Sequence, residues 1–192
     1  MFRKLTFALA ACLAGAAAPA AAADGFFAQA DIGDRTQSAV ATASRGALSY
    51  GTTLSNYEGG RSGTTFLAYT LPLEAPATVR LGPAVGLRRS DGEAREVEAG
   101  LRVAVDRWTA TPFGSIYGLA EASSVHRSWF VLGQVTFAPA NIGIELSRGG
   151  SEDYHETTLA VQKRLGQGPV SLRLGYKLSS DEIFAGISIN TF

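Results

Sequence analysis

Residues 170–192 read VSLRLGYKLSSDEIFAGISINTF and predict a β-hairpin. Apolar residues alternate with polar or small ones before the segment SSDE, and the same alternation resumes after it. Because successive side chains of a strand point to opposite faces, each strand has one apolar face and one polar face. Placing Leu178 opposite Ile183 matches aliphatic residues on one face and sets Arg173 opposite Ser188 on the other. We therefore expect an antiparallel strand pair here.

A second hairpin is expected over residues 79–106, where two alternating segments flank a polar loop. Pairing Arg88 with Glu98 sets Arg80 opposite Asp106, so a single register matches two pairs of opposite charge. The same alternation recurs from residue 46 onward without helical periodicity. These features predict an all-β, up-and-down antiparallel barrel of about ten strands, with eight or twelve as alternatives.

The first residues have the features of an export signal. A basic start, an apolar segment and an Ala-Ala-Ala site before Asp24 predict a secretory signal peptide over residues 1–23. Cys12 is the only cysteine, and it lies within this leader, so we expect an exported chain without thiols. Cleavage of a lipoprotein type before Cys12 is the less favoured alternative. Residues 24–45 are expected to be mobile or to pack in the lumen, with an extra strand pair as the alternative.

Residues 46–192 are expected to form one barrel domain that crosses a membrane. Their apolar faces carry no charge over about nine residues, near the length that crosses a bilayer at a tilt. Their polar faces mix charged residues with glycine and alanine, which is typical of a crowded barrel interior. The aromatic residues Tyr50, Tyr69, Trp108, Tyr117, Trp129 and Tyr176 are compatible with interfacial girdles.

Together with the terminal Phe192, these features resemble a Gram-negative outer-membrane β-barrel. The resemblance implies contact with outer-membrane lipid, both termini in the periplasm, and recognition of Phe192 by the barrel-assembly machinery. Strict alternation nevertheless places Phe192 in phase with the lumen, unless a bulge over residues 188–191 turns it outward. Lysine and arginine balance aspartate and glutamate at 17 each, which indicates no nucleic-acid partner.

Charged residues on the polar faces are the main candidate site. We expect an inward-facing network of Arg80, Arg88, Glu98, Arg102, Asp106, Glu145, Arg164, Arg173 and Lys177. Such a network either lines a channel or forms a salt-bridged plug, and a barrel of about ten strands favours the plug. Because basic residues outnumber acidic ones in this set, any open path is expected to prefer anions.

Catalytic and metal motifs are weak. His126 and Ser128 form an H-x-S that resembles the lipid A deacylase family, which implies a histidine base and a serine nucleophile. Trp129 stands where that family has asparagine, so an exposed, non-catalytic loop is favoured. Residues 153–156 (DYHE) are interpreted as a solvated polar loop rather than a metal or protease site. We expect no metal and no cofactor, since no phosphate-binding loop, dinucleotide fingerprint, HExxH or CxxC occurs.

The favoured function is a non-enzymatic outer-membrane barrel that acts as a structural anchor, a narrow channel or an accessory to surface export. The alternatives are a lipid A-modifying hydrolase and a soluble periplasmic ligand-binding barrel. The sequence indicates neither a solute nor a surface partner.

Overall fold

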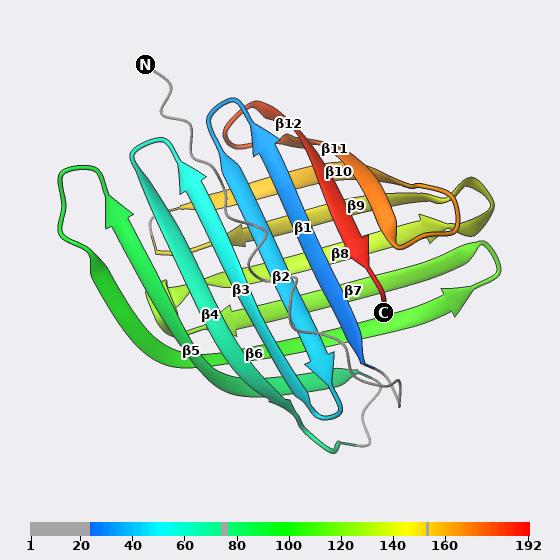
Figure 1. Ribbon diagram of the computed structural model, residues 1–192, viewed down its shortest axis with the longest axis horizontal. Coiled ribbons are helices and arrows are strands. Elements are labelled where there is room, and N and C mark those ends of the chain that lie inside the picture. Colours follow the sequence, from blue (N-terminus) through cyan, green and yellow to red (C-terminus); the bar gives the residue numbers. More distant parts are fainter. Residues whose placement is uncertain (1–23, 74–76, 153) are drawn as a thin grey trace.

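The computed structural model describes residues 24–73, 77–152 and 154–192, so the expected signal peptide lies outside the described residues. Twelve antiparallel strands form a closed barrel in which each strand pairs with its sequence neighbours and β1 pairs with β12 (Figure 1). The strands are β1 Gly25–Gly33, β2 Gln37–Arg45, β3 Leu48–Tyr57, β4 Gly60–Thr70, β5 Thr78–Ser90, β6 Glu96–Thr111, β7 Gly114–Ser123, β8 Trp129–Phe137, β9 Ile142–Gly150, β10 His155–Arg164, β11 Val170–Lys177 and β12 Glu182–Asn190. Two single-turn 3₁₀ helices, η2 Val125–Arg127 and η3 Ala138–Ala140, lie in the connections. Among the described residues, no helix is long and apolar enough to cross a membrane.

The strand count exceeds the expected ten because residues 24–45 form β1 and β2 instead of a mobile or lumen-packing segment. β2 is built largely from alanine, serine and threonine, so its two faces differ little in polarity and give a weak alternation signal. The alternation of β2 does not identify it as a strand, but closure of the barrel requires this strand pair. β1 is hydrogen-bonded to β2 on one side and to β12 on the other. Without this pair the edges of β3 and β12 would keep unpaired backbone groups.

Both expected hairpins form, and in both the predicted register was wrong by two residues. Ile183 lies opposite Tyr176 rather than Leu178, and Arg173 lies opposite Gly186 rather than Ser188. A shift of two residues keeps every side chain on its predicted face while changing its partner. The observed register sets the bulky Phe184 against Gly175, which is a better steric match than the predicted one.

In the second hairpin, Arg88 lies opposite Glu96, and Glu98 lies opposite Gly86. The predicted Arg88–Glu98 pairing was therefore wrong. Arg80 lies opposite Ala104 but still forms an ion pair with Asp106, which it reaches diagonally across the lumen face. The last paired residues of this ladder are Arg88 and Glu96.

The assignment of the two faces is confirmed. Outside β7, large side chains expected to face outward are exposed, with Leu101 and Leu174 both at 61%, whereas the Arg102 and Arg173 side chains are 13% and 2% exposed. Aliphatic residues therefore cover most of the outside, and most of the charged residues that were expected inside lie in the lumen.

One strand was predicted with its faces reversed. Tyr117 and Leu119 of β7 were expected on the apolar face, but Glu121, two residues further along, pairs with Arg102 in the lumen. Since alternate residues share a face, Tyr117 and Leu119 face the lumen too. Small residues such as Gly118 and Ala120 occupy the outer face of β7, so hydrophobicity alone pointed to the wrong side.

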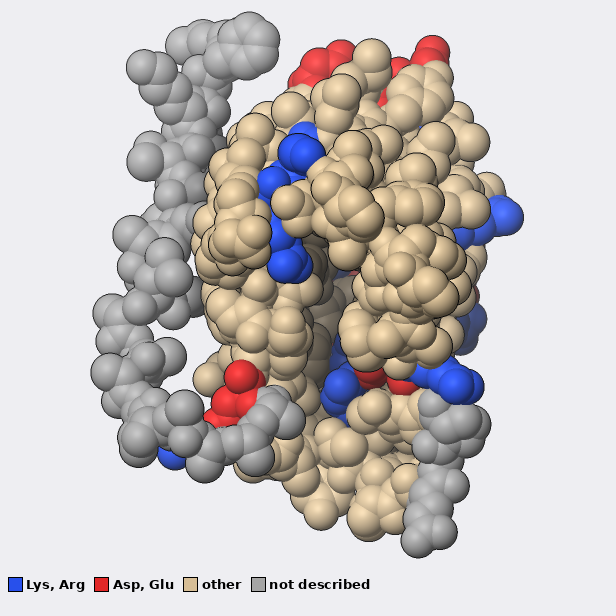
Figure 2. All heavy atoms as spheres, turned by 90° about the vertical axis from the view of Figure 1, so that its right-hand side faces the viewer, with Lys and Arg blue, Asp and Glu red and all other residues tan. Residues whose placement is uncertain are grey.

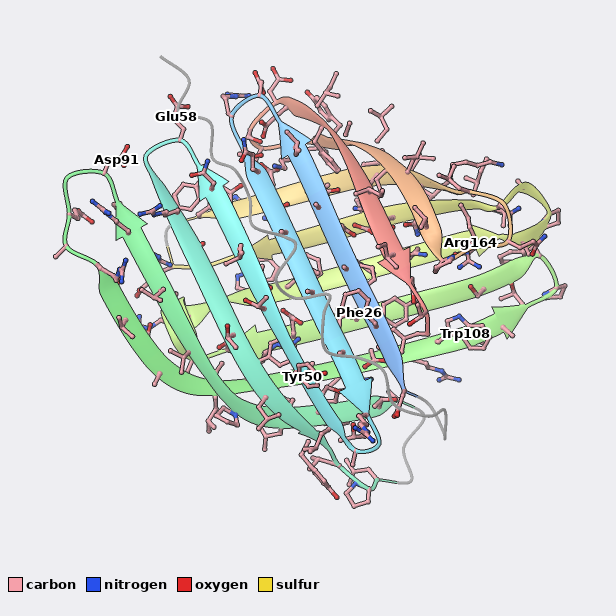
Figure 3. The ribbon with its side chains drawn as sticks, viewed as in Figure 1. Phe26, Tyr50, Glu58, Asp91, Trp108 and Arg164 are labelled. Carbon is pink, nitrogen blue, oxygen red and sulfur yellow. The ribbon has the colours of Figure 1, made fainter. Side chains whose placement is uncertain are left out.

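The two ends of the barrel differ. The start of β1 and the end of β12 lie at what we call the terminal end, joined there by hydrogen bonds between Phe26 and Thr191. The connections at this end include residues 112–113 and 165–169, each with a proline. The opposite end, called the loop end, carries Glu58 and Asp91, while Arg164 and Trp108 lie toward the terminal end (Figure 3).

Candidate functional site

Arg173 joins three strands inside the barrel. Its Nε donates to Asp31 Oδ1 of β1 at 3.2 Å, and its Nη1 and Nη2 donate to the two carboxylate oxygens of Glu145 of β9 at 2.9 and 3.3 Å. All three residues are buried, at 4%, 7% and 6% exposure respectively. A guanidinium that meets one carboxylate with two bonds is a strong, directional contact. We call Asp31, Glu145 and Arg173 the buried triad.

Glycines provide the space around the buried triad. Gly186 lies opposite both Arg173 and Asp31, and a Cβ at Gly186 would lie 2.0 Å from Asp31 Oδ1. In the same way, the ring of Phe184 covers Gly175, where a Cβ would lie 2.3 Å from the ring. Long side chains set against glycines fill this part of the lumen.

The charged pairs on β5, β6 and β7 are more exposed to water. Arg80 pairs with Asp106, and Arg102 pairs with Glu121. The Arg80 and Glu121 side chains are 26% and 28% exposed although they face the interior. The Arg102 guanidinium also lies 3.9 Å above the Phe66 ring, a cation–π contact that holds it against β4.

The β7–β8 connection folds into the lumen. Val125 of η2 is 1% exposed and packs with Phe66 and Ala84. Glycines make this entry possible, because a Cβ at Gly86 would lie 2.4 Å from Val125 Cγ1. The next residue, His126, takes a positive φ of 52°. We call residues 124–128 the inward loop.

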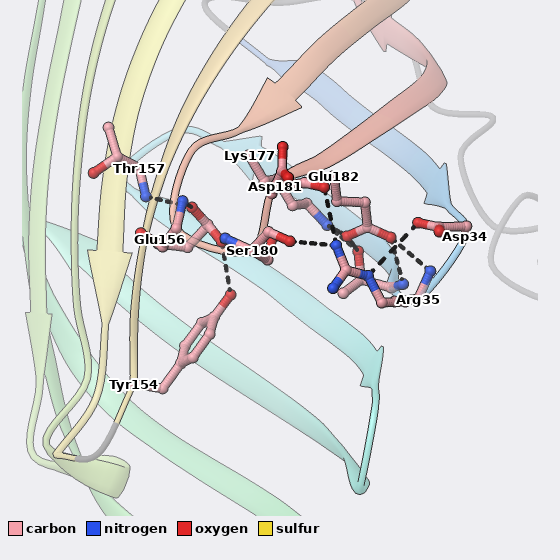
Figure 4. Close-up of polar contacts among 11 residues, drawn as sticks. Asp34, Arg35, Tyr154, Glu156, Thr157, Lys177, Ser180, Asp181 and Glu182 are labelled. Carbon is pink, nitrogen blue, oxygen red and sulfur yellow. Dashed lines mark hydrogen bonds and ion pairs between the residues drawn. The ribbon is translucent and has the colours of Figure 1, made fainter.

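Two carboxylates tie the hairpin connections together at the loop end (Figure 4). Glu182 accepts hydrogen bonds from the backbone N–H groups of Arg35 and Thr36 at 2.7 and 2.8 Å, and Lys177 Nζ lies 3.3 Å from it. The Arg35 guanidinium donates in turn to the backbone carbonyls of the β11–β12 turn. Glu182 therefore fixes the β1–β2 turn to the β11–β12 hairpin.

Glu156 does the same for the β9–β10 connection. It accepts backbone N–H bonds from Ser179 and Ser180 at 2.7 and 3.1 Å, and the Tyr154 hydroxyl donates to it at 3.4 Å. Burial, followed by the charge of Glu156, raises the pKa of Tyr154 to about 12. The expectation of a solvated loop was wrong for Glu156, which is 8% exposed. Asp153 lies outside the described residues.

Most of the charges expected inside take part in these contacts. Arg80, Arg102, Asp106, Glu145, Arg173 and Lys177 each belong to an ion pair, and Glu98 contacts His126. Arg88 lies on the lumen face opposite Glu96 but makes no ion pair with any described residue.

Sequence reasoning missed several inward acids, among them three that form ion pairs with basic residues of the expected network. Asp31 lies in the segment for which no strand was favoured, Glu121 lies on the strand predicted with its faces reversed, and Glu182 was assigned to the turn. The sequence did contain a signal for these acids, since Arg173 and Lys177 were expected inside and had no predicted acidic partners. Adding these acids removes the excess of basic residues on which the expected anion preference depended.

His126 and Ser128 have different hydrogen-bonding partners. The Ser128 hydroxyl donates to the Val125 carbonyl at 2.9 Å, while His126 Nδ1 lies 3.2 Å from Glu98 Oε2. The expectation that His126 is exposed was also wrong, because its side chain is only 7% exposed. Among the described residues, no hydrogen bond joins the Ser128 hydroxyl to His126.

Phe192 follows the end of β12 and is 63% exposed. A Cβ at Gly25 would lie 2.0 Å from its ring. Gly25 shares the lumen phase of Asp31, so the ring lies on the inner side of β1 at the terminal end.

Comparisons with known proteins concern the fold. No protein-family model matches the chain, and no curated protein matches it. The solved structure of KdgM porin is similar, with a TM-score of 0.51 and 10% identity over 86% of this chain and 98% of that chain. A structure described as KdgM porin in complex with disordered oligogalacturonate has a TM-score of 0.49 and 11% identity over the same shares. The chain therefore has the fold of a small outer-membrane β-barrel.

Proposed function

We propose that this chain is a non-enzymatic outer-membrane protein that forms a narrow, water-filled channel. The observation that carries the proposal is the partial exposure of charged side chains inside a closed barrel. Ion-paired residues in a sealed plug would be as buried as Arg173, whereas Arg80 and Glu121 remain about a quarter exposed. Water therefore reaches part of the lumen.

The shape of the molecule supports the same conclusion. The space-filling view is hollowed between two walls, with Lys, Arg, Asp and Glu side chains along the opening (Figure 2). Twelve strands also enclose a wider interior than ten, which weakens the reason for preferring a plug. The buried triad and the inward loop fill part of this space, which narrows the channel, and they leave the rest of it open.

The outer surface supports a membrane location. Exposed aliphatic side chains such as Leu81, Val85, Leu146 and Ile183 lie on the outside, where lipid would cover them. By analogy with other barrels of this class, both termini face the periplasm, and the barrel-assembly machinery reads the end of the chain at Phe192. A structural anchor or an export accessory would have the same outer surface. What distinguishes a channel from these two is an open lumen.

Cysteine accessibility separates a channel from a plug. If Cys12 is removed with the leader, the exported chain has no thiol, so single cysteines report their own positions. Gln162 faces the lumen, because a Cβ at Gly143 would lie 2.8 Å from its side chain. Its neighbour Val161 faces outward and is 45% exposed. We expect a charged, membrane-impermeant thiosulfonate to modify Gln162→Cys in liposomes and to leave the matched control Val161→Cys unmodified.

The same variants are then studied in planar bilayers. Wild-type protein should give defined conductance steps, and modification of Gln162→Cys should reduce them. A barrel that folds, shown by heat-modifiable migration, but conducts no ions would refute the channel and favour the anchor or export function. An altered lipid A profile that depends on Ser128 would refute the non-enzymatic assignment.

A further inference from the structure

Three metal-ligating side chains gather where the inward loop meets β6. One ring nitrogen of His126 and one carboxylate oxygen each of Glu96 and Glu98 all lie within 4.8 Å of one another. His126 Nδ1 lies 3.2 Å from Glu98 Oε2. Two ligand atoms of a tetrahedral zinc ion, with bonds of about 2.0–2.2 Å, stand roughly 3.3–3.5 Å apart. This pair is therefore already at the spacing of two zinc ligands.

The His126 ring is buried but incompletely satisfied. Its side chain is 7% exposed, and Nε2 has no hydrogen-bond partner among the described residues. Buried polar atoms in native proteins are nearly always partnered, because an unpaired one costs about 1–3 kcal/mol. The two ring nitrogens face different ways: Nδ1 lies beside the Glu98 carboxylate, whereas a Cβ at Gly86 would lie 2.7 Å from Nε2. The nitrogen that faces the carboxylates is Nδ1, and its burial beside two acids is what points to a bound cation.

The backbone of the inward loop adopts an unfavourable conformation in this arrangement. His126 and Arg127 have φ values of 52° and 44°, in the left-handed region that non-glycine residues rarely adopt. Such conformations persist where the surroundings compensate for them. Here the compensation is the burial of Val125 and the bond from the His126 backbone N–H to Glu98 Oε2 at 2.7 Å.

We propose that His126, Glu98 and Glu96 form a site for a divalent transition-metal ion, for which Zn²⁺ is the probe. An imidazole nitrogen with carboxylate oxygens suits Zn²⁺ better than Mg²⁺ or Ca²⁺, which prefer oxygen ligands alone. The Glu98 side chain is 39% exposed, so an ion can enter from the loop end and keep water as a further ligand. His126 lies 28 residues from Glu98 in the sequence, which explains why no motif predicts the site.

A bound ion would fasten the inward loop to β6 inside the lumen. In the channel proposed above it would lower the conductance, a consequence that rests on the proposed function. Binding of the ion itself does not depend on that function. The two are therefore measured separately.

The test is calorimetric titration of Zn²⁺ into the folded, tag-free barrel in detergent. We expect one ion per chain, and we expect His126→Ala and Glu98→Gln each to weaken binding at least tenfold. His155→Ala is the matched control, because the chain has only these two histidines, and it should bind as the wild type does. Heat-modifiable migration verifies folding, and Glu98→Gln keeps the test decisive if His126→Ala does not fold.

Absence of saturable binding, or an equal loss in His155→Ala, would overturn the site. Zn²⁺ at saturation should also reduce the wild-type conductance and leave that of Glu98→Gln unchanged. Binding with an unaltered conductance in a conducting barrel would refute the fastening of the loop. A barrel that binds Zn²⁺ as expected but never conducts would refute the channel and support the metal site.

Discussion

Replacing Arg173 by methionine should cost more stability than the same exchange at Arg80. The change at Arg173 removes three charged hydrogen bonds and leaves Asp31 and Glu145, at 7% and 6% exposure, without their cation. Removing one partner of a buried ion pair costs about 3–5 kcal/mol, chiefly because the remaining charge stays desolvated. Asp31 keeps one bond, from Gln29 Nε2 at 2.8 Å, so we expect the lower half of this range.

The exchange at Arg80 is the matched control, because its pair with Asp106 is partly exposed at 26% and 11%. Water screens that pair, so Arg80→Met should cost about 1 kcal/mol or less. The measurement is urea-dependent unfolding of each barrel in phospholipid vesicles, followed by heat-modifiable migration and by the fluorescence of Trp108 and Trp129.

A third variant separates the charge effect from the packing effect. Combining Arg173→Met with Asp31→Asn and Glu145→Gln removes all three charges, and it should recover all but about 1–2 kcal/mol of the loss. If Arg173→Met and Arg80→Met differ by less than about 1 kcal/mol, the buried triad does not hold the strands as the structure indicates. If the neutral variant recovers nothing, the loss arises from packing alone.

Three further changes test other parts of the barrel. Gly175→Val should lower the free energy of unfolding by about 1–3 kcal/mol, because the new side chain displaces the Phe184 ring. The control Gly133→Val, where the side chain meets open space, should cost little. Equal urea midpoints for the two variants would contradict this. Glu121→Gln should shift the reversal potential in a KCl gradient toward anion selectivity, because Arg102 loses its counter-charge, while Asp91→Asn in an exposed loop should not. The Tyr154 phenol should ionise near pH 12 in a difference spectrum against Tyr154→Phe, and Glu156→Gln should lower that pKa only in part, since burial is the larger cause. Because the folded pKa lies above the ordinary value near 10, the protonated phenol contributes stability below pH 10 that is lost as the pH rises through 12. Ionisation near pH 10 would contradict the raised pKa.

The sequence predicts the faces of most strands because alternation is a local property. Leu101, Leu174, Arg102 and Arg173 all lie on their predicted sides, since a strand displays its two faces whatever its partner is. Alternation does not identify the faces of β2 and β7, because many of their residues are alanine or glycine, whose side chains are neither strongly apolar nor polar. A small residue is tolerated on both sides of a barrel, so it carries little information about which side it faces.

Register is less predictable because competing registers two residues apart give equally good faces. For the last hairpin the choice rests on contacts outside the pair. Arg173 meets Asp31 of β1 and Glu145 of β9, and the glycine opposite it gives the Asp31 carboxylate room to approach. These partners lie 142 and 28 residues away in the sequence, beyond the reach of a pairwise comparison of two strands.

The same reasoning explains why the lumen was harder to predict than the lipid surface. In a membrane barrel an outward residue has one environment, the acyl chains, so hydrophobicity identifies it where the side chain is large, although not in β7. The contacts of an inward residue depend on distant parts of the chain. Arg173 pairs with acids two strands away, and Glu98 contacts His126 of a loop that folds back into the lumen. Closing twelve strands brings such partners together, so the chemistry of this barrel follows from its closure, whereas the outer surface follows from the alternation of each strand.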